Sequence, residues 1–321
     1  GRDRDRGDSR GDYREPYRRR GTVITDGEFL ARRENVDREM VVRQIGDRIQ
    51  IGVIEDKVMV EHYVNRNANV SYVGNVYLGR VQNVLPSMEA AFVDIGKGRN
   101  AVLYAGEVNW DAAGISESAP RKIETVLKSG QPVLVQVTKD PIGQKGARLT
   151  SQISLPGRYV VYVPGGGMSG ISKRLPEEER SRLKSILKNL IPEEAGVIVR
   201  TAAEGIPESE IAQDMAYLAK LWEFIQRKQK SIVVPSLIFE ELPLPQRVIR
   251  DLANEATSKI SVDSREIHAK LQEFVAEFVP SMQTRLIHYP GERPIFDLYN
   301  VEEDIQKALQ TRVALKSGGY L

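Results

Sequence analysis

The sequence predicts an α+β protein of several domains, in which a small β-barrel and a β/α segment interrupt a discontinuous α/β domain. Three observations lead to this prediction. Strand-like runs at 40–64 form a meander that brings no helix to cover it. Short apolar runs separated by glycine-bearing turns then follow at 73–155. Helical patterns that can complete the meander come only at 243–278.

Composition excludes several classes of protein. The chain has 321 residues, of which 41% are hydrophobic, enough for more than one core. It has no cysteine, which excludes disulfides and thiolate zinc sites, and its three histidines are far apart in the sequence. No long apolar run suits a membrane span or a secretory signal. We therefore expect no transmembrane segment, no metal site in this sequence and a cytoplasmic location.

Residues 1–37 are predicted to be a disordered, Arg-rich leader and linker. The first 20 residues hold eight arginines, five acidic residues and no aliphatic residue, so they cannot form a core. Two interpretations are compatible with this composition. The segment is either a solvated leader or an RNA tether, in which arginine neutralises phosphate and Tyr13 and Tyr17 stack on bases.

The predicted discontinuous α/β domain comprises residues 38–70 and 236–290. Its first part is an antiparallel meander with strands at 40–45, 48–55 and 58–64, joined by hairpin turns. Three strands alone cannot bury both faces, so they need partners from elsewhere in the chain. The predicted partners are helices at 243–257 and 264–278 and strands at 259–262 and 283–288.

Residues 71–155 are predicted to be a small Greek-key barrel of the OB class, a fold whose exposed strand face binds oligonucleotides. Its strands are expected at 73–84, 89–95, 100–104, 132–138 and 147–155, with a short helix near 121–128. The next segment, 156–235, is predicted to contain strands at 157–164, 170–174 and 196–201 and helices at 176–190 and 207–230. An amphipathic helix at 298–309 and a hairpin that starts at 312–319 without being completed are expected last.

Three motifs carry a resemblance to a known family: Gly79-Arg80-Val81, the run PSMEAAFVDIG at 86–96 and the run KGARLT at 145–150. The segment resembles the RNA-binding OB-fold of ribosomal protein S-one, as inserted in bacterial endoribonucleases of the RNase E/RNase G family, here of the actinobacterial type. The resemblance covers about residues 41–321. It implies that the discontinuous domain is RNase H-like, that 156–235 is a 5′-sensor and that 291–321 begin a DNase I-like subdomain. It also implies a function in RNA processing and mRNA decay, with single-stranded RNA as the ligand.

Phe92 and Lys145 are the predicted RNA-binding residues. By pattern alone, Phe92 is equally a core residue or a ring that stacks on a base. The resemblance implies the second role, with Lys145 as a nearby basic contact. The family's second aromatic residue is replaced here by Val102, and Tyr104, two residues on, is the candidate substitute.

A second candidate site follows the apolar run at 197–199. The charged residue after this run marks either the surface end of a strand or a phosphate clamp, built from a guanidinium fork and a hydroxyl group. The resemblance implies a clamp for a 5′-monophosphate. The predicted clamp residues are Gly157, Val161 (through its backbone), Arg200, Thr201, Lys173 and Arg174.

No catalytic residue is expected within this sequence. The resemblance implies that the parent protein uses two Mg²⁺-binding aspartates and a structural zinc site, both beyond Leu321. Asp297 and Asp304 match no family motif and are predicted to be a helix N-terminal charge and part of a solvated face. The parent is expected to form a homo-oligomer and to join an RNA-degradation assembly.

Two other functions remain open from the sequence. A stand-alone, non-catalytic RNA-binding module is the first alternative, and the uncompleted hairpin argues against it. An oligomerisation scaffold is the second, and it predicts that substitutions on the basic face leave RNA affinity unchanged.

Purified residues 1–321 are expected to bind a single-stranded oligoribonucleotide and to leave it intact in the presence of Mg²⁺, because the metal-binding aspartates of the family motif are expected elsewhere. Incubation with end-labelled RNA, with and without a chelator, checks this. Specific cutting that the chelator abolishes would contradict the expectation and would require a carboxylate pair within these residues.

Overall fold

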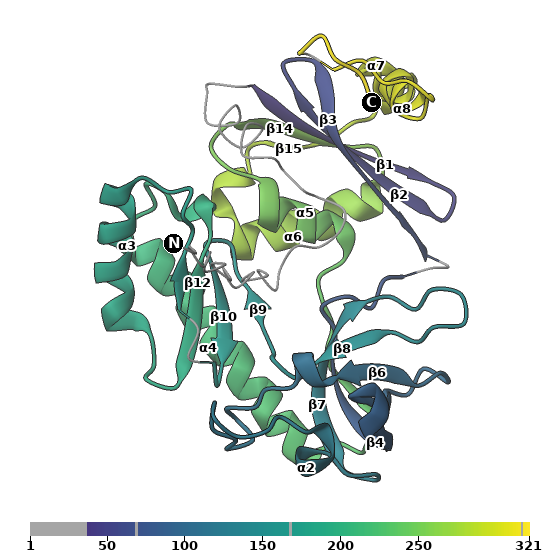
Figure 1. The fold of residues 1–321 in the computed structure, drawn as a ribbon. Coiled ribbons are helices and arrows are strands. Elements are labelled where there is room, and N and C mark those ends of the chain that lie inside the picture. The colour runs from purple at the N-terminus through teal and green to yellow at the C-terminus, as the bar shows by residue number, and fades with distance from the viewer. Residues whose placement is uncertain (1–36, 68–69, 167–168, 316) are drawn as a thin grey trace, which may run out of the picture. The chain divides into compact units, whose positions relative to one another are not determined.

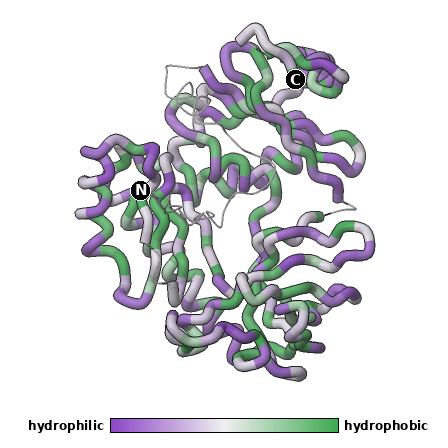
Figure 2. The backbone as a smooth tube through the Cα atoms, in the orientation of Figure 1, coloured by the Kyte–Doolittle hydropathy of each residue, from purple (hydrophilic) through white to green (hydrophobic). Residues whose placement is uncertain are grey.

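The computed structural model describes residues 37–67, 70–166, 169–315 and 317–321. The predicted leader lies outside the described residues, except for Asp37. Residues Asp37–Leu321 form one compact unit, which contains a five-stranded, a six-stranded and a four-stranded sheet. Figure 2 shows hydrophobic stretches in each of the three sheets.

The five-stranded sheet joins segments from both sides of the barrel. Its order is β15-β14-β1-β2-β3. The strands are β1 (Arg38–Ile45), β2 (Arg48–Glu55), β3 (Val58–Arg66), β14 (Thr257–Val262) and β15 (Leu286–His288). The first three form the predicted antiparallel meander, whereas β14 pairs in parallel with both β1 and β15. Figure 1 shows the purple N-terminal strands beside the green and yellow-green strands from the end of the chain.

Helices cover both faces of this sheet. One face packs on α5 (Leu244–Leu252) and α6 (Arg265–Phe278), with η5 (Pro280–Met282) next to them. The predicted start of α6 is confirmed, because the Ser264 hydroxyl caps the helix by accepting from the Ile267 N–H at 3.4 Å. The other face is covered by α7 (Ile295–Leu298) and α8 (Val301–Ala308), which bury Phe296 and Val301 against Val41 and Ile54. The sheet therefore has the two apolar coverings that a buried sheet needs.

Four expectations about the last third of the chain are corrected. The single helix at 298–309 is wrong: Asn300 has a φ of 55°, and this left-handed residue separates α7 from α8. Residues 236–239 form β13 (Ser236–Phe239), which pairs with the barrel instead of with the five-stranded sheet. The hairpin at 312–319 is completed, because Val313 and Leu321 exchange two backbone hydrogen bonds. Finally, the Asp304 carboxylate is not merely solvated, since it accepts from the Met59 N–H of the edge strand at 3.1 Å.

The predicted OB barrel is present. Its strands are β4 (Val76–Leu85), β5 (Ala90–Asp94), β6 (Ala101–Tyr104), β7 (Pro132–Lys139) and β8 (Arg148–Thr150). They follow the order β4-β5-β6-β8-β7, and β7 pairs back onto β4 to close the barrel. The connections include the turns η2 (Pro86–Met88) and η3 (Ala105–Glu107) and the short helix α2 (Ile123–Val126). Closure leaves no free strand edge between β4 and β7.

The segment after the barrel is a four-stranded sheet with two helices. The strands are β9 (Leu155–Pro156), β10 (Val160–Pro164), β11 (Gly170–Ile171) and β12 (Ala195–Val199), in the order β11-β12-β10-β9. The helices are α3 (Glu177–Leu190) and α4 (Glu208–Ser231), and the turn η4 (Thr201–Ala203) follows β12. The strand predicted at 170–174 is shorter than expected, because the chain turns after Ile171.

Candidate functional site

Phe92 lies on the outer side of the barrel. Its neighbours along β5, Ala91 and Val93, are fully buried in the barrel core, whereas Phe92 is partly exposed and does not belong to that core. Successive residues of a strand point to opposite faces, so the Phe92 ring is directed away from the core. The interpretation of Phe92 as a core residue is therefore wrong.

The strands beside Phe92 place a second ring on this face. Phe92 is the register partner of Val102 on β6, and Val102 is the partner of Arg148 on β8. Tyr104 is two residues beyond Val102 and hence on the same face, and 36% of its surface is exposed. The Arg148 guanidinium lies 5.2 Å from the centre of the Tyr104 ring, as in a cation–π pair. Val102 is flanked by these two rings and a guanidinium.

Lys145 lies in the turn before β8, the strand that carries Arg148. It closes a tight turn in which the backbones of Ile142 and Lys145 bond to each other, and its side chain is exposed. The next residue, Gly146, packs so closely on the Asn100 carbonyl that a Cβ atom there would overlap it. The glycine of the KGARLT run therefore holds the lysine-bearing turn against the start of β6.

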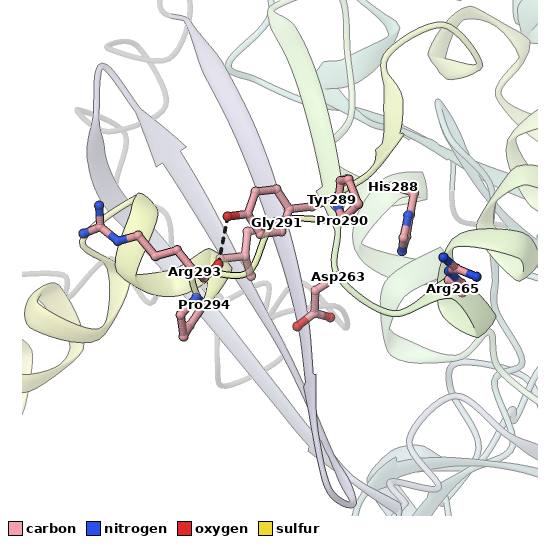
Figure 3. A pocket seen from close by; sticks show the side chains of 9 residues that line it. Asp263, Arg265, His288, Tyr289, Pro290, Gly291, Arg293 and Pro294 are labelled. Atoms are coloured by element: carbon pink, nitrogen blue, oxygen red, sulfur yellow. Dashed lines mark hydrogen bonds between the residues drawn. The ribbon is translucent and has the colours of Figure 1, made fainter.

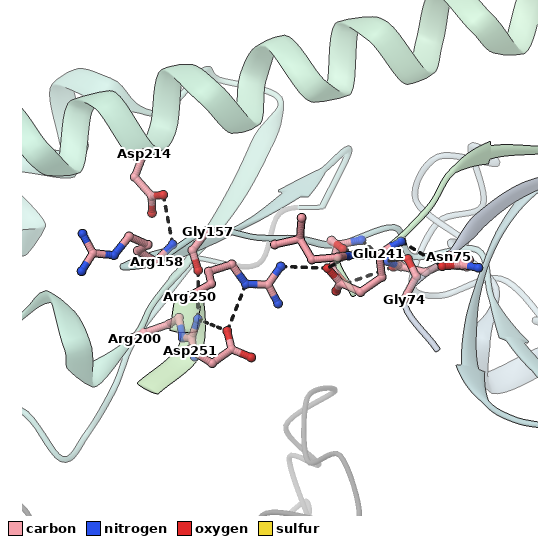
Figure 4. Close-up of polar contacts among 12 residues, drawn as sticks. Gly74, Asn75, Gly157, Arg158, Arg200, Asp214, Glu241, Arg250 and Asp251 are labelled. Atoms are coloured by element: carbon pink, nitrogen blue, oxygen red, sulfur yellow. Dashed lines mark hydrogen bonds and ion pairs between the residues drawn. The ribbon is translucent and has the colours of Figure 1, made fainter. Parts of the chain in front are cut away.

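Arg200 follows β12 and is held on one side of its guanidinium group. Its Nη1 donates to the Gly157 carbonyl at 2.9 Å and to Oδ1 of Asp251 at 3.0 Å (Figure 4). The side chain remains 27% exposed. The structure thus brings Arg200 and Gly157 together as predicted, but the Gly157 N–H already donates to the Val160 carbonyl at 2.8 Å. Gly157 offers its carbonyl to Arg200 and no free N–H to a phosphate.

The other predicted clamp residues lie near Arg200, around the C-terminal ends of strands β11 and β12. Because β11 and β12 are parallel, Lys173 and Arg174 leave the sheet where Arg200 and Thr201 do. Both basic side chains are exposed, and they follow β11 instead of belonging to it. The Thr201 hydroxyl forms no hydrogen bond within the described part of the chain. Val161 lies next to this edge on β10 and is 6% exposed.

The loop before β10 is shaped by a carboxylate that the sequence analysis missed. Asp214 of α4 accepts hydrogen bonds from the consecutive N–H groups of Arg158, Tyr159 and Val160, at 3.0, 2.9 and 3.1 Å. Gly157 packs directly on this carboxylate, and any side chain there would overlap it. Burial raises the pKa of Asp214, although the three N–H groups and the Arg200 charge oppose the rise. Asp214 thus fills the N–H groups that an external anion would otherwise use.

Helix α3 fixes the turn that carries Thr201. Glu179 accepts from the Gly205 N–H at 2.8 Å and pairs with Arg182, also at 2.8 Å. Arg182 donates to the Ile206 carbonyl at 2.9 Å. The hydrogen bonds from Arg182, with the Gly205 N–H, lower the pKa of Glu179 to about 2. This pair clamps residues 201–206 onto the helix.

A chain of ion pairs continues from Arg200 through α5 towards the start of the barrel. Asp251 also accepts from Nε of Arg250 at 3.1 Å, and Nη1 of Arg250 binds Glu241 at 2.8 Å. The Glu241 N–H in turn donates to the Asn75 side chain at 2.9 Å (Figure 4). Burial disfavours ionisation of Asp251, but Arg200 and Arg250 outweigh this effect and lower its pKa. No local pattern in the sequence signals this contact, because Asp251 lies inside the helix predicted at 243–257, away from its expected end.

A polar pocket of about 310 Å³ lies where β14 and β15 end. Figure 3 shows Asp263, Arg265, His288 and Arg293 around it, and the Tyr289 hydroxyl donates to the Arg293 carbonyl at 2.8 Å. Asp263 accepts from the Gln44 N–H at 2.9 Å, and burial raises its pKa. These residues lie outside the sites predicted from the sequence.

Comparison with known proteins identifies the family. Residues 154–321 match the profile described as "Ribonuclease E/G family", and residues 72–140 match the "S1 RNA binding domain". The chain belongs to the ribonuclease E/G family. It is 43% identical over 289 residues to "Ribonuclease G" of Salmonella typhimurium, with 88% of this chain and 59% of that protein aligned. "Ribonuclease E" of Nostoc sp. is 37% identical over 289 residues, with 86% of this chain and 40% of that protein aligned.

The chain thus spans 59% of the length of the ribonuclease G relatives that it matches. The resemblance to the RNase E/G family and its S1-type domain, expected from the sequence, is confirmed. In the part that the structure describes, no helix has the length and apolar character needed to cross a membrane.

The residues in hand do not fit the metals that the family resemblance implies. Residues 1–321 contain no cysteine for a thiolate zinc site. Within residues 37–321, as far as they are described, no three His, Cys, Asp or Glu side chains gather in a way that could hold a metal ion.

The Glu179 contacts should make stability depend on pH. Glu179 has a folded-state pKa lowered from 4.5 to about 2, so its contribution to stability is present above about pH 4.5 and is lost as the pH falls towards about 2. Wild type should exceed Glu179→Gln in urea midpoint at neutral pH, and the difference should shrink over that acidic range. Glu177→Gln, which removes an exposed partner of Arg180 on the same helix, is the control and should change the urea midpoint at neutral pH only slightly. A constant difference at every pH would contradict the assigned contacts.

Proposed function

We propose that this chain is the RNA-recognition part of an endoribonuclease of the ribonuclease E/G family, binding single-stranded RNA and sensing its 5′-monophosphate. The whole protein is proposed to act in RNA processing and mRNA decay. The observation that carries the proposal is the half-occupied guanidinium of Arg200. Its Nη1 has two partners, whereas its Nε and Nη2 have none among the described residues, beside Thr201 and two exposed basic side chains.

The barrel is proposed to hold the RNA strand. An S1-type domain supports RNA binding as such. Phe92 and Tyr104 offer rings on which RNA bases of any sequence can stack. Lys145 and Arg148 offer positive charge to the RNA phosphates. In this proposal Tyr104, which contacts Arg148, replaces the aromatic residue that the family has at the position of Val102.

The C-terminal ends of β11 and β12 in the four-stranded sheet are proposed to hold the 5′ end of the RNA. A phosphate dianion matches the free Nε–Nη2 edge of a guanidinium group, because two parallel N–H bonds meet two phosphate oxygens. The Thr201 hydroxyl, Lys173 and Arg174 would supply further donors. Gly157 and Val161 contribute to the proposed phosphate site through their backbone. Gly157 does so by accepting a hydrogen bond from Arg200, and it donates none to the phosphate.

The finer domain assignments are part of the same proposal. The five-stranded sheet with its helices is proposed to be RNase H-like, residues 156–235 to be the 5′-sensor, and 291–321 to lead into a DNase I-like subdomain. For the whole protein we propose Mg²⁺-dependent cleavage, a structural Zn²⁺, a homo-oligomeric state and membership of an RNA-degradation assembly. A stand-alone module is less well supported, since the family match covers 154–321, outside most of the barrel.

RNAs that differ only at the 5′ end test the proposed 5′-end sensing. Wild type should bind a 5′-monophosphorylated oligomer about ten- to a hundredfold more tightly than its 5′-hydroxyl form, the effect expected of one or two charge-assisted hydrogen bonds. A 5′-triphosphate should bind no better than the monophosphate. Arg200→Ala should remove the preference and leave hydroxyl-RNA binding nearly unchanged, as measured by fluorescence anisotropy.

Arg180→Ala is the matched control, because Arg180 lies on α3 of the same segment, pairs with Glu177 at 2.9 Å and forms no side-chain hydrogen bond with a predicted clamp residue among those described. It should keep the wild-type preference. If wild type binds all three RNAs equally, Arg200 is a surface arginine at a strand end and the sensor proposal fails.

Single substitutions test the barrel face. Phe92→Ala and Tyr104→Ala should each reduce RNA affinity by about 1–3 kcal/mol, the usual effect of losing one stacked ring. Lys145→Ala should weaken binding and lower the salt dependence by about one phosphate contact. All three variants should keep the wild-type melting temperature, since none of these side chains is in the barrel core.

Tyr320→Ala is a suitable control, because Tyr320 is an exposed ring, 62% accessible, in the hairpin at 313–321. It should not alter RNA affinity. A Tyr104→Ala variant with unchanged affinity would show that this second ring takes no part in binding.

A further inference from the structure

We propose that Asp251 is a positioning residue for the RNA 5′ phosphate, acting by fixing the guanidinium of Arg200 so that its Nε–Nη2 edge remains free for the ligand. This inference rests on the proposed 5′-end sensing and adds a residue to it. Asp251 lies on α5, 51 positions from Arg200 in sequence and in a different sheet's layer.

The geometry of Nη1 is the first argument. Each terminal nitrogen of a guanidinium group carries two N–H bonds. Those of Nη1 are directed to the Gly157 carbonyl at 2.9 Å and to Asp251 Oδ1 at 3.0 Å. Two acceptors on one nitrogen define both the position and the plane of the group. The opposite edge, Nε with Nη2, is then the bidentate edge presented to a phosphate.

The place of Asp251 in its helix is the second argument. Helix α5 ends at Leu252, so Asp251 sits in the last turn, where the helix dipole disfavours a negative charge. Local preference alone would not select a carboxylate there. Its two guanidinium partners, Arg200 and Arg250, compensate for the unfavourable position. A local rule broken in favour of a tertiary contact is typical of a functional position.

Asp251 is itself held in place by the ion pair between Arg250 and Glu241. Arg250 is 9% exposed and is itself fixed by Glu241, which is 4% exposed. A carboxylate shared between two guanidinium groups carries little net repulsion towards an approaching anion. Asp251 can therefore orient Arg200 without excluding the phosphate, and the buried Arg250–Glu241 pair keeps Asp251 in place.

The test is the ratio of affinities for 5′-monophosphorylated and 5′-hydroxylated forms of one oligomer. Asp251→Ala should lower this ratio about tenfold, because an unfixed guanidinium must be ordered by the ligand. Hydroxyl-RNA affinity should not change. Asp251→Asn, which retains an Oδ1 acceptor in the same shape, should give an intermediate ratio and serves if the alanine variant folds poorly. In the Arg200→Ala background, neither change at Asp251 should alter the ratio further.

Glu55→Gln is the matched control, since it also removes a carboxylate from a guanidinium ion pair, with Arg38 at 2.7 Å, on the five-stranded sheet. It should affect stability and leave the ratio unchanged. A wild type without any 5′ preference would refute the proposed function itself. A wild type with the preference, and Asp251 variants that keep it fully or increase it, would refute only the positioning role; an increase would show that the carboxylate competes with the phosphate.

Discussion

The first half of strand β4, Val76–Gly79, is buried on both of its faces, and the arrangement of the barrel and the following β/α segment depends on this burial. Tyr77 and Val81 point into the barrel core, whereas Val76 and Leu78 belong to the core formed with α3 and α4. The same strand pairs with β5, β7 and β13. Two hydrophobic cores that share one strand cannot shift independently without exposing apolar surface. The S1-type barrel and the candidate 5′ site are thus built on one packed body.

Contacts to the five-stranded sheet and its helices are of a different kind. Arg200, Asp251, Arg250 and Glu241 connect the end of β12 to α5 through ion pairs of 2.8–3.1 Å. A hydrogen bond from the Glu241 N–H to Asn75 then reaches the start of the barrel. Charged groups out of water are costly unless each is paired, so these contacts favour one arrangement of the partners more than they add stability. The candidate phosphate site lies at the first pair of this chain. Binding there would act on a contact that holds separate elements together.

The parts of the fold that local patterns describe were predicted well. The meander, the first four barrel strands and helices α3, α4 and α6 lie within a few residues of their expected positions, because period-two and period-3.6 patterns act within one element. The fifth barrel strand, predicted at 147–155, is instead divided into β8 and β9, which belong to different sheets. The errors have local causes as well. Asn300 in the left-handed conformation divides a continuous apolar stripe, and β13 is too short and too apolar to reveal which sheet it joins. Phe92 could not be placed inside or outside the barrel until the register of β5 was known.

The sequence by itself determined the type of most elements, the OB class of the barrel, the family and the side chains available at the candidate sites. Tertiary structure alone decided which of these groups meet. It placed the Asp214 carboxylate on the N–H groups of residues 158–160, turned the Gly157 carbonyl to Arg200, and set Asp251 beside the same guanidinium. The physical reason is that hydrophobic periodicity encodes which face of an element is buried. It does not encode which polar group of a distant element will compensate a charge at its end.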